Sequence, residues 1–238
     1  MKRFYKETSV ESAEDGYCVL LDGKPMRTPA KAVLVVPTRA LAEAIAAEWR
    51  TVPEKADINV AHLALTRLAA TGLDRVAGQR ARVIEDTAKY GGSDMLCYRA
   101  GEPETLARRQ LETWQPLLDW ASERYGARLA VVEGTAFVPQ PADSTARLQA
   151  AVAAHGDLAL SALYNLTHIA GSLVIALAVA EGRLSAEAAF AAAQLDELYQ
   201  IERWGDDPIA AKRHEGIRHD IAAAARFLAL LEARRLKG

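Results

Sequence analysis

Short apolar runs separated by turn residues dominate the first 36 residues of the chain. The longest run, residues 16–21, ends at Asp22-Gly23, a pair that typically forms a tight hairpin turn. A second short β-branched run covers residues 32–36. Prolines at positions 25 and 29 favour an edge or irregular strand after the turn. The pattern therefore predicts a small β unit at the N-terminus.

After residue 36, apolar side chains recur every three or four positions, as on amphipathic helices. Thr38 is expected to cap the first helix, which carries Leu41, Ile45 and Trp49 on one face. Further helices are predicted over residues 60–90, from Pro103 to Gly126, over 144–154, over 157–181 and from Ser185 to Trp204, with a last helix from Asp206-Asp207-Pro208 onwards.

Together these patterns predict an α+β fold with a small N-terminal β-rich domain and a larger all-α helical domain. The predicted N-terminal domain covers residues 1–60 and includes one helix. The C-terminal helical domain covers residues 61–238.

Two tryptophans lie on the apolar stripes of predicted helices, and both are expected to support the structure from within a core. Trp49 ends the stripe of the first helix, and Trp114 lies on the stripe of the helix from Pro103. Pro116 is expected to kink or split that second helix, because proline cannot donate the intrahelical hydrogen bond.

The span from Leu158 to Ala180 contains no Asp, Glu, Lys or Arg and is long enough to cross a membrane. Polar residues within it and the lack of basic flanks favour the buried central helix of a bundle instead. We therefore expect no stable membrane insertion, and we expect His168 to be a hydrogen-bonded core histidine.

Charge and motif content exclude several classes of function. The chain has 29 Lys and Arg against 31 Asp and Glu, a net charge of −2, whereas nucleic-acid binding requires a basic face. Cys18 and Cys97 stand alone and indicate small buried side chains rather than a metal site. The chain has neither a phosphate-binding loop nor a dinucleotide fingerprint. We therefore predict no metal and no cofactor.

One segment, residues 195–207 with the sequence LDELYQIERWGDD, gathers carboxylates beside aromatic side chains. Its members of interest are Asp196, Glu197, Tyr199 and Trp204. Three interpretations stay open on the residues alone. The segment is a solvated helix face, or a surface that binds a partner through aromatic area and carboxylates, or an enzyme site in which paired carboxylates act on a small molecule.

The sequence resembles the assembly chaperones of the ATP synthase catalytic sector, the family that attends the α subunit. The resemblance covers nearly the whole chain. It is carried by seven segments in order: KRFYK at 2–6, LLDGKPMRTPA at 20–30, VPTRALAEAIAAEW at 36–49, LTRLAATGLDRV at 65–76, YGGSDMLCYRA at 90–100, WQPLLDWA at 114–121 and LDELYQIERWGDD at 195–207.

The resemblance implies a chaperone, not an enzyme, that works without ATP hydrolysis and has no small-molecule substrate. Such a chaperone binds the unassembled α subunit and shields the surface that later meets the β subunit. The acidic helix position of the family falls on Glu197, with Asp196, Tyr199 and Trp204 around it. The tryptophan of its N-terminal helix falls on Trp49.

The resemblance also bears on cellular location. Eukaryotic relatives are mitochondrial matrix proteins. This chain begins without a presequence and is rich in alanine and arginine, which favours a bacterial protein in the cytoplasm.

Overall fold

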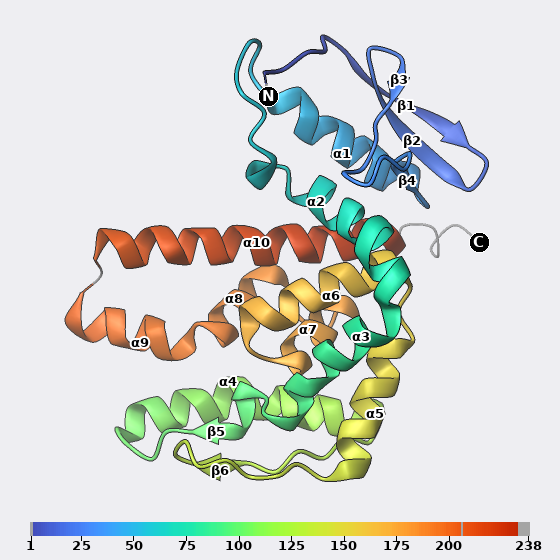
Figure 1. Ribbon diagram of the computed structural model, residues 1–238. Helices are drawn as coiled ribbons and strands as arrows, with labels where there is room; N and C mark the ends of the chain where they lie inside the picture. Colours follow the sequence, from blue (N-terminus) through green and yellow to red (C-terminus); the bar gives the residue numbers. More distant parts are fainter. Residues whose placement is uncertain (1, 206, 233–238) are drawn as a thin grey trace. The chain divides into compact units, whose positions relative to one another are not determined.

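The computed structural model describes residues 2–205 and 207–232, and Figure 1 shows their helices and strands. The fold is α+β, as predicted, with a small antiparallel sheet near the N-terminus and helices after it. Two compact units are present. In the described chain, unit 1 holds residues 2–80, 157–162 and 226–232, and unit 2 holds residues 81–156 and 163–225. The domain boundary predicted at residue 60 separates two parts that would each fold by themselves, and it stays a prediction.

Unit 1 contains the sheet. Its strands are β1 (Thr8–Ala13), β2 (Gly16–Leu21), β3 (Lys24–Pro25) and β4 (Val35–Val36). β2 pairs antiparallel with all three others. The turn between β2 and β3 falls at Asp22-Gly23, as predicted, with φ values of 49° and 74°. Positive φ at both positions is the requirement of the hairpin turns that Asp-Gly favours. The strand predicted over residues 32–36 is shorter and covers only β4.

Helix α1 (Arg39–Thr51) packs against β1 and β2. Thr38 caps it as predicted, because its Oγ1 accepts a hydrogen bond from the Leu41 backbone N–H at 3.2 Å. Leu41, Ile45 and Trp49 are all buried. The Thr38 cap therefore located the start of this helix, and the spacing of apolar residues located its inner face.

The helix predicted over residues 60–90 is not continuous. It consists of η1 (Val60–His62), α2 (Ala64–Thr71), the π turn η2 (Gly72–Val76), α3 (Ala77–Ala88) and η3 (Lys89–Gly92). Gly72 lies so close to the Leu158 backbone that a Cβ there would be 3.0 Å from the Leu158 Cα. A local helical spacing cannot show this packing constraint, which involves residues far apart in the sequence.

Unit 2 is mainly helical. Its elements are the larger part of α3, η3, η4 (Met95–Cys97), β5 (Tyr98–Arg99), α4 (Glu104–Tyr125), β6 (Val132–Glu133), α5 (Ala142–Ala153), the larger part of α6 (Asp157–Ala170), α7 (Leu173–Ala180), α8 (Ala186–Ala193), α9 (Leu195–Trp204) and most of α10 (Pro208–Glu232). Residues 173–179 of α7 are all buried, and α4 and α8 contact this helix. α7 is thus the central helix that the uncharged span predicted.

The uncharged span forms two helices rather than one. Gly171 ends α6 with a φ of 65°, a left-handed conformation that glycine adopts without steric cost. Ser172 then caps α7 through its Oγ, which accepts from the Ile175 backbone N–H at 3.1 Å. No helix in the described residues is both long enough and apolar enough to span a bilayer.

The prediction for His168 was wrong, because its side chain is exposed. The ring lies 4.4 Å from the ring of Tyr164 and 5.1 Å from that of Tyr90, measured between centroids. His168 thus belongs to an aromatic cluster at the surface of unit 2.

Two further expectations about helix boundaries need correction. The helix predicted from Ser185 to Trp204 divides at Gln194 into α8 and α9. Trp114 Nε1 donates to the Ala192 carbonyl at 2.9 Å, and a continuous helix would use this carbonyl for the Asp196 N–H. α4 is not split at Pro116; the buried side chains on both sides of the proline pack into one core.

Candidate functional site

The acidic segment forms α9, which lies beside α4 in Figure 1 and contacts it. Asp196 Oδ1 accepts a hydrogen bond from Gln110 Nε2 of α4 at 2.7 Å. The Tyr199 hydroxyl lies 2.5 Å from Thr105 Oγ1, also on α4. Tyr199 is 4% exposed. Of the four residues predicted to bind a partner, Asp196 and Tyr199 therefore hold α9 on its support.

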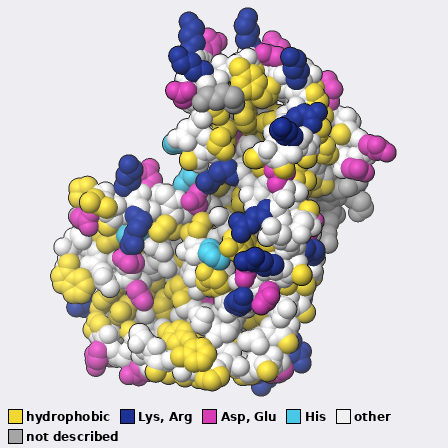
Figure 2. Space-filling model, in the orientation of Figure 1, with side chains coloured by type: hydrophobic (Ala, Val, Ile, Leu, Met, Phe, Trp, Pro, Cys, Tyr) yellow, Lys and Arg dark blue, Asp and Glu magenta, His cyan; other side chains and the backbone are white. Residues whose placement is uncertain are grey.

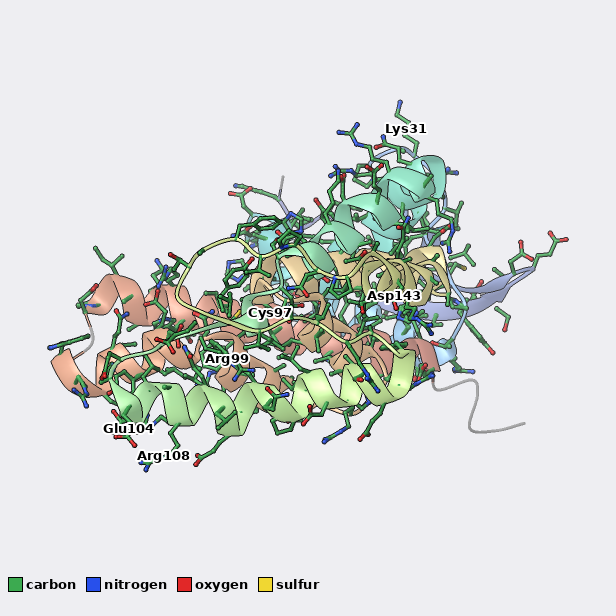
Figure 3. The ribbon with its side chains drawn as sticks, turned by 90° about the horizontal axis from the view of Figure 1, so that it is seen from below. Lys31, Cys97, Arg99, Glu104, Arg108 and Asp143 are labelled. Carbon is green, nitrogen blue, oxygen red and sulfur yellow. The ribbon has the colours of Figure 1, made fainter. Side chains whose placement is uncertain are left out.

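Gln110 extends this support to the short strand before α4. Its side-chain Oε1 accepts from the Ala100 backbone N–H at 2.7 Å, and its backbone carbonyl accepts from Arg99 Nη1 at 3.0 Å. In Figure 3, Arg99 lies along the ribbon of α4, while Glu104 and Arg108 project outward from that helix. A buried amide with its polar groups bonded fixes the position of its neighbours, because an unmade bond there would be costly.

Two arginines enclose the ring of Tyr199. The guanidinium carbons of Arg109 and Arg203 lie 5.3 Å and 5.0 Å from its centroid. Arg109 Nη1 also pairs with Glu202 Oε2 at 2.6 Å. Stacking and ion pairing together attach the C-terminal half of α9 to α4.

Glu197 and Trp204 point away from this support. The Glu197 side chain is 48% exposed, and its Oε2 lies 3.2 Å from Arg213 Nη2 of α10. Trp204 is 76% exposed. Ile209, in the first turn of α10, is 84% exposed and was missed by the sequence analysis. An apolar residue directly after Pro208 in a polar segment was the available signal.

Asp207 caps α10, as the sequence predicted. Its Oδ1 accepts from the backbone N–H groups of Ile209 at 2.8 Å and Ala210 at 3.0 Å. These hydrogen bonds hold the pKa of the Asp207 carboxyl below its usual value. Asp206, the other acidic residue predicted at this start, lies outside the described residues.

Trp49 and Trp114 both lie inside the protein. Trp49 is 8% exposed, and its Nε1 donates to Thr66 Oγ1 at 3.0 Å. The neighbouring Glu48 carboxylate accepts from the Leu65 and Thr66 backbone N–H groups and so caps α2. Trp114 is 1% exposed. Their role as structural support stays a prediction.

Metal ligands, thiols and cavities are the other features of the described residues that could carry chemistry. No group of His, Cys, Asp and Glu among them could hold a metal ion. Burial raises the pKa of the Cys97 thiol to about 12, so it stays unreactive. A cavity of about 900 Å³ lies between residues 12–17 and 37–40 of unit 1, and no residue of α9 lines it. On the face visible in Figure 2, charges of both signs are interspersed with apolar side chains.

Exposed aromatic and charged side chains on well-packed helices are features of surfaces that bind another protein. Comparison with known proteins identifies the family to which the chain belongs. Residues 2–122 match the family model described as ATP12 chaperone protein. The chain belongs to the ATP12 chaperone family. This confirms the resemblance to the assembly chaperones of ATP synthase that the sequence indicated.

Individual relatives agree with this assignment. The chain is 23% identical over 236 residues to the mitochondrial protein atp12 of Schizosaccharomyces pombe, covering 94% of this chain and 81% of that one. It is 40% identical to Atp12 from Paracoccus denitrificans, whose crystal structure matches with a TM-score of 0.90. The match covers 97% of this chain and 98% of that one. A lysine-for-aspartate variant of that protein matches equally well, with coverage of 97% of both chains.

Proposed function

We propose that this chaperone binds the unassembled α subunit of ATP synthase and shields the surface that later meets the β subunit. The observation that carries the proposal is that α9 and the start of α10 expose Glu197, Trp204 and Ile209. In this proposal Glu197 is a charged anchor and the two apolar side chains supply contact area. Asp196 and Tyr199 hold the helix that presents them.

The physical need for such a protein follows from the client. Obligate subunit interfaces commonly exceed about 2,000 Å² and resemble a protein core cut in half. A free subunit with such a surface aggregates. A binding face with a few apolar residues and one carboxylate covers part of it with intermediate affinity.

Release requires only competition in this proposal. If the β subunit binds the same surface more strongly by about 1.4 kcal/mol, it is favoured tenfold. The chaperone then catalyses no reaction and needs no cofactor. We propose that it acts in the bacterial cytoplasm; its relative from Schizosaccharomyces pombe is mitochondrial.

A refolding experiment tests the function. Denatured α subunit is diluted with and without the chaperone, and soluble protein is analysed by size-exclusion chromatography. We expect soluble α subunit to elute together with the chaperone in the absence of nucleotide, and we expect added β subunit to displace the chaperone. Equal aggregation of α subunit in both samples would refute the proposal.

Two variants test the face. Glu197→Gln keeps the shape of the side chain and removes its charge, so we expect weaker α-subunit binding. Glu187→Gln is a matched control, because Glu187 is an exposed carboxylate of α8 that also pairs with an arginine, Arg218. Trp204→Ala should lose binding at an unchanged melting temperature, since Trp204 is 76% exposed. Binding at wild-type strength by both Glu197→Gln and Trp204→Ala would exclude this face as the contact.

A further inference from the structure

Each described carboxylate of α9 already has a partner within the chain. Asp196 accepts from Gln110, Glu202 pairs with Arg109, and Glu197 pairs with Arg213. The Oε2 atom of Glu197 therefore already lies against a guanidinium of the chaperone. A basic group of a client that binds this oxygen exchanges one cation for another.

We propose that Arg213 is an internal competitor of the client: a basic side chain of the α subunit takes its place on Glu197 during binding, and Arg213 returns there on release. This inference rests on the proposed function. It makes Arg213 a residue that tunes client affinity and release, although it need not contact the client itself.

The geometry distinguishes this ion pair from its neighbour on the same helix. The Arg109–Glu202 pair is 2.6 Å long, and Arg109 also stacks on the ring of Tyr199. The Arg213–Glu197 pair is longer, at 3.2 Å, and the Arg213 side chain is 55% exposed. Arg109 is nearly as exposed, at 47%, but its shorter ion pair and its stacking on Tyr199 hold it, so the Arg213 pair is the one that opens more readily.

A second carboxylate is available to the displaced guanidinium. Asp207 precedes Arg213 by six residues, about 1.7 helical turns, at the start of α10. Backbone hydrogen bonds lower the pKa of Asp207, and the charge of Arg213 lowers it further. Arg213 can therefore leave Glu197 without leaving the field of a negative charge.

The expected effect is modest and has a definite sign. Exposed ion pairs contribute little, so removal of Arg213 should strengthen α-subunit binding by up to about fivefold. Displacement by β subunit should slow in proportion, because affinity changes within one interface lie mostly in the dissociation rate. Salt screens exposed charges, so the gain should shrink as ionic strength rises.

The experiment uses the full-length chaperone immobilised on a sensor surface, with refolded α subunit as the probe and β subunit as the competitor. We expect Arg213→Gln to bind more tightly and to be displaced more slowly than wild type. Arg213→Lys should restore wild-type behaviour. Lys212→Gln is the matched control, because Lys212 is an exposed cation next in sequence whose described contacts include no ion pair. It should bind as wild type does.

The double variant Glu197→Gln/Arg213→Gln identifies the cause. If Arg213 acts through Glu197, the gain disappears in this background. A gain that persists there, or Arg213→Gln binding no tighter than wild type, overturns the exchange. Loss of binding in Glu197→Gln alone would then leave the proposed function standing. Failure of the wild-type chaperone to bind α subunit would overturn both.

Discussion

Asp94 lies fully buried in unit 2, where it joins two segments distant in sequence. Its Oδ1 accepts from the Leu96 backbone N–H at 3.1 Å, and its Oδ2 accepts from the Val174 N–H of α7 at 3.0 Å. Burial raises the pKa of the carboxyl from 3.8 to about 6, against the opposing effect of these hydrogen bonds. Ionised Asp94 therefore carries a cost in the folded protein.

The sign of the pH dependence follows from this shift. Between pH 3.8 and about 6, the folded state binds the proton that the unfolded state has lost. The contribution of Asp94 to stability is thus complete below pH 3.8 and is lost as pH rises through about 6. A shift of about two pKa units corresponds to about 3 kcal/mol, of which about 2 kcal/mol falls between pH 4.5 and 7.5.

Urea unfolding followed by circular dichroism measures this contribution. The free energy of unfolding is determined from pH 4.5 to 7.5 for wild type and Asp94→Asn, whose side chain does not titrate. We expect the stability of wild type relative to the variant to fall by about 2 kcal/mol as pH rises. Asp143→Asn, at an exposed position of α5, is the control for the loss of one carboxylate. A difference between wild type and Asp94→Asn that is constant across this range would refute the reasoning.

Three more substitutions test particular parts of the fold. Trp49→Arg should lower the free energy of unfolding by about 3–5 kcal/mol, since it empties a core site and buries a charge; an unchanged melting temperature would contradict the core role. Gly171→Ala should cost about 1–2 kcal/mol in denaturant unfolding, because its φ of 65° strains any residue with a Cβ; equal stability would show that the backbone relaxes there. Asp207→Ala should cost about 1 kcal/mol through loss of the α10 cap, and a smaller loss for Asp207→Asn would support the cap over the charge.

Local sequence determined much of the secondary structure, because the interactions responsible are local. Thr38 reaches the Leu41 N–H three residues ahead, and Asp22-Gly23 has the positive φ values that its turn requires. Gly126 ends α4 at a φ of 69°, where a helix end was expected. These signals depend on a few neighbouring residues and can be read without the rest of the protein.

Tertiary contacts determined the features that the sequence analysis missed. Trp114 donates to the Ala192 carbonyl where the predicted helix divides into α8 and α9. Asp94 bonds to Val174 at the start of α7, and Gly72 lies against Leu158. Each of these pairs is separated by about 80 residues, so no periodicity within one segment contains it.

The candidate site shows the same division. The sequence by itself marked residues 195–207 through their unusual mixture of carboxylates and aromatic side chains, and the family resemblance selected Glu197. Only the tertiary structure decided that Tyr199 is buried on α4, that Trp204 and Ile209 are exposed, and that Glu197 faces Arg213. Chemical character belongs to a residue and can be read from the chain, whereas exposure and pairing depend on which other helices pack beside it.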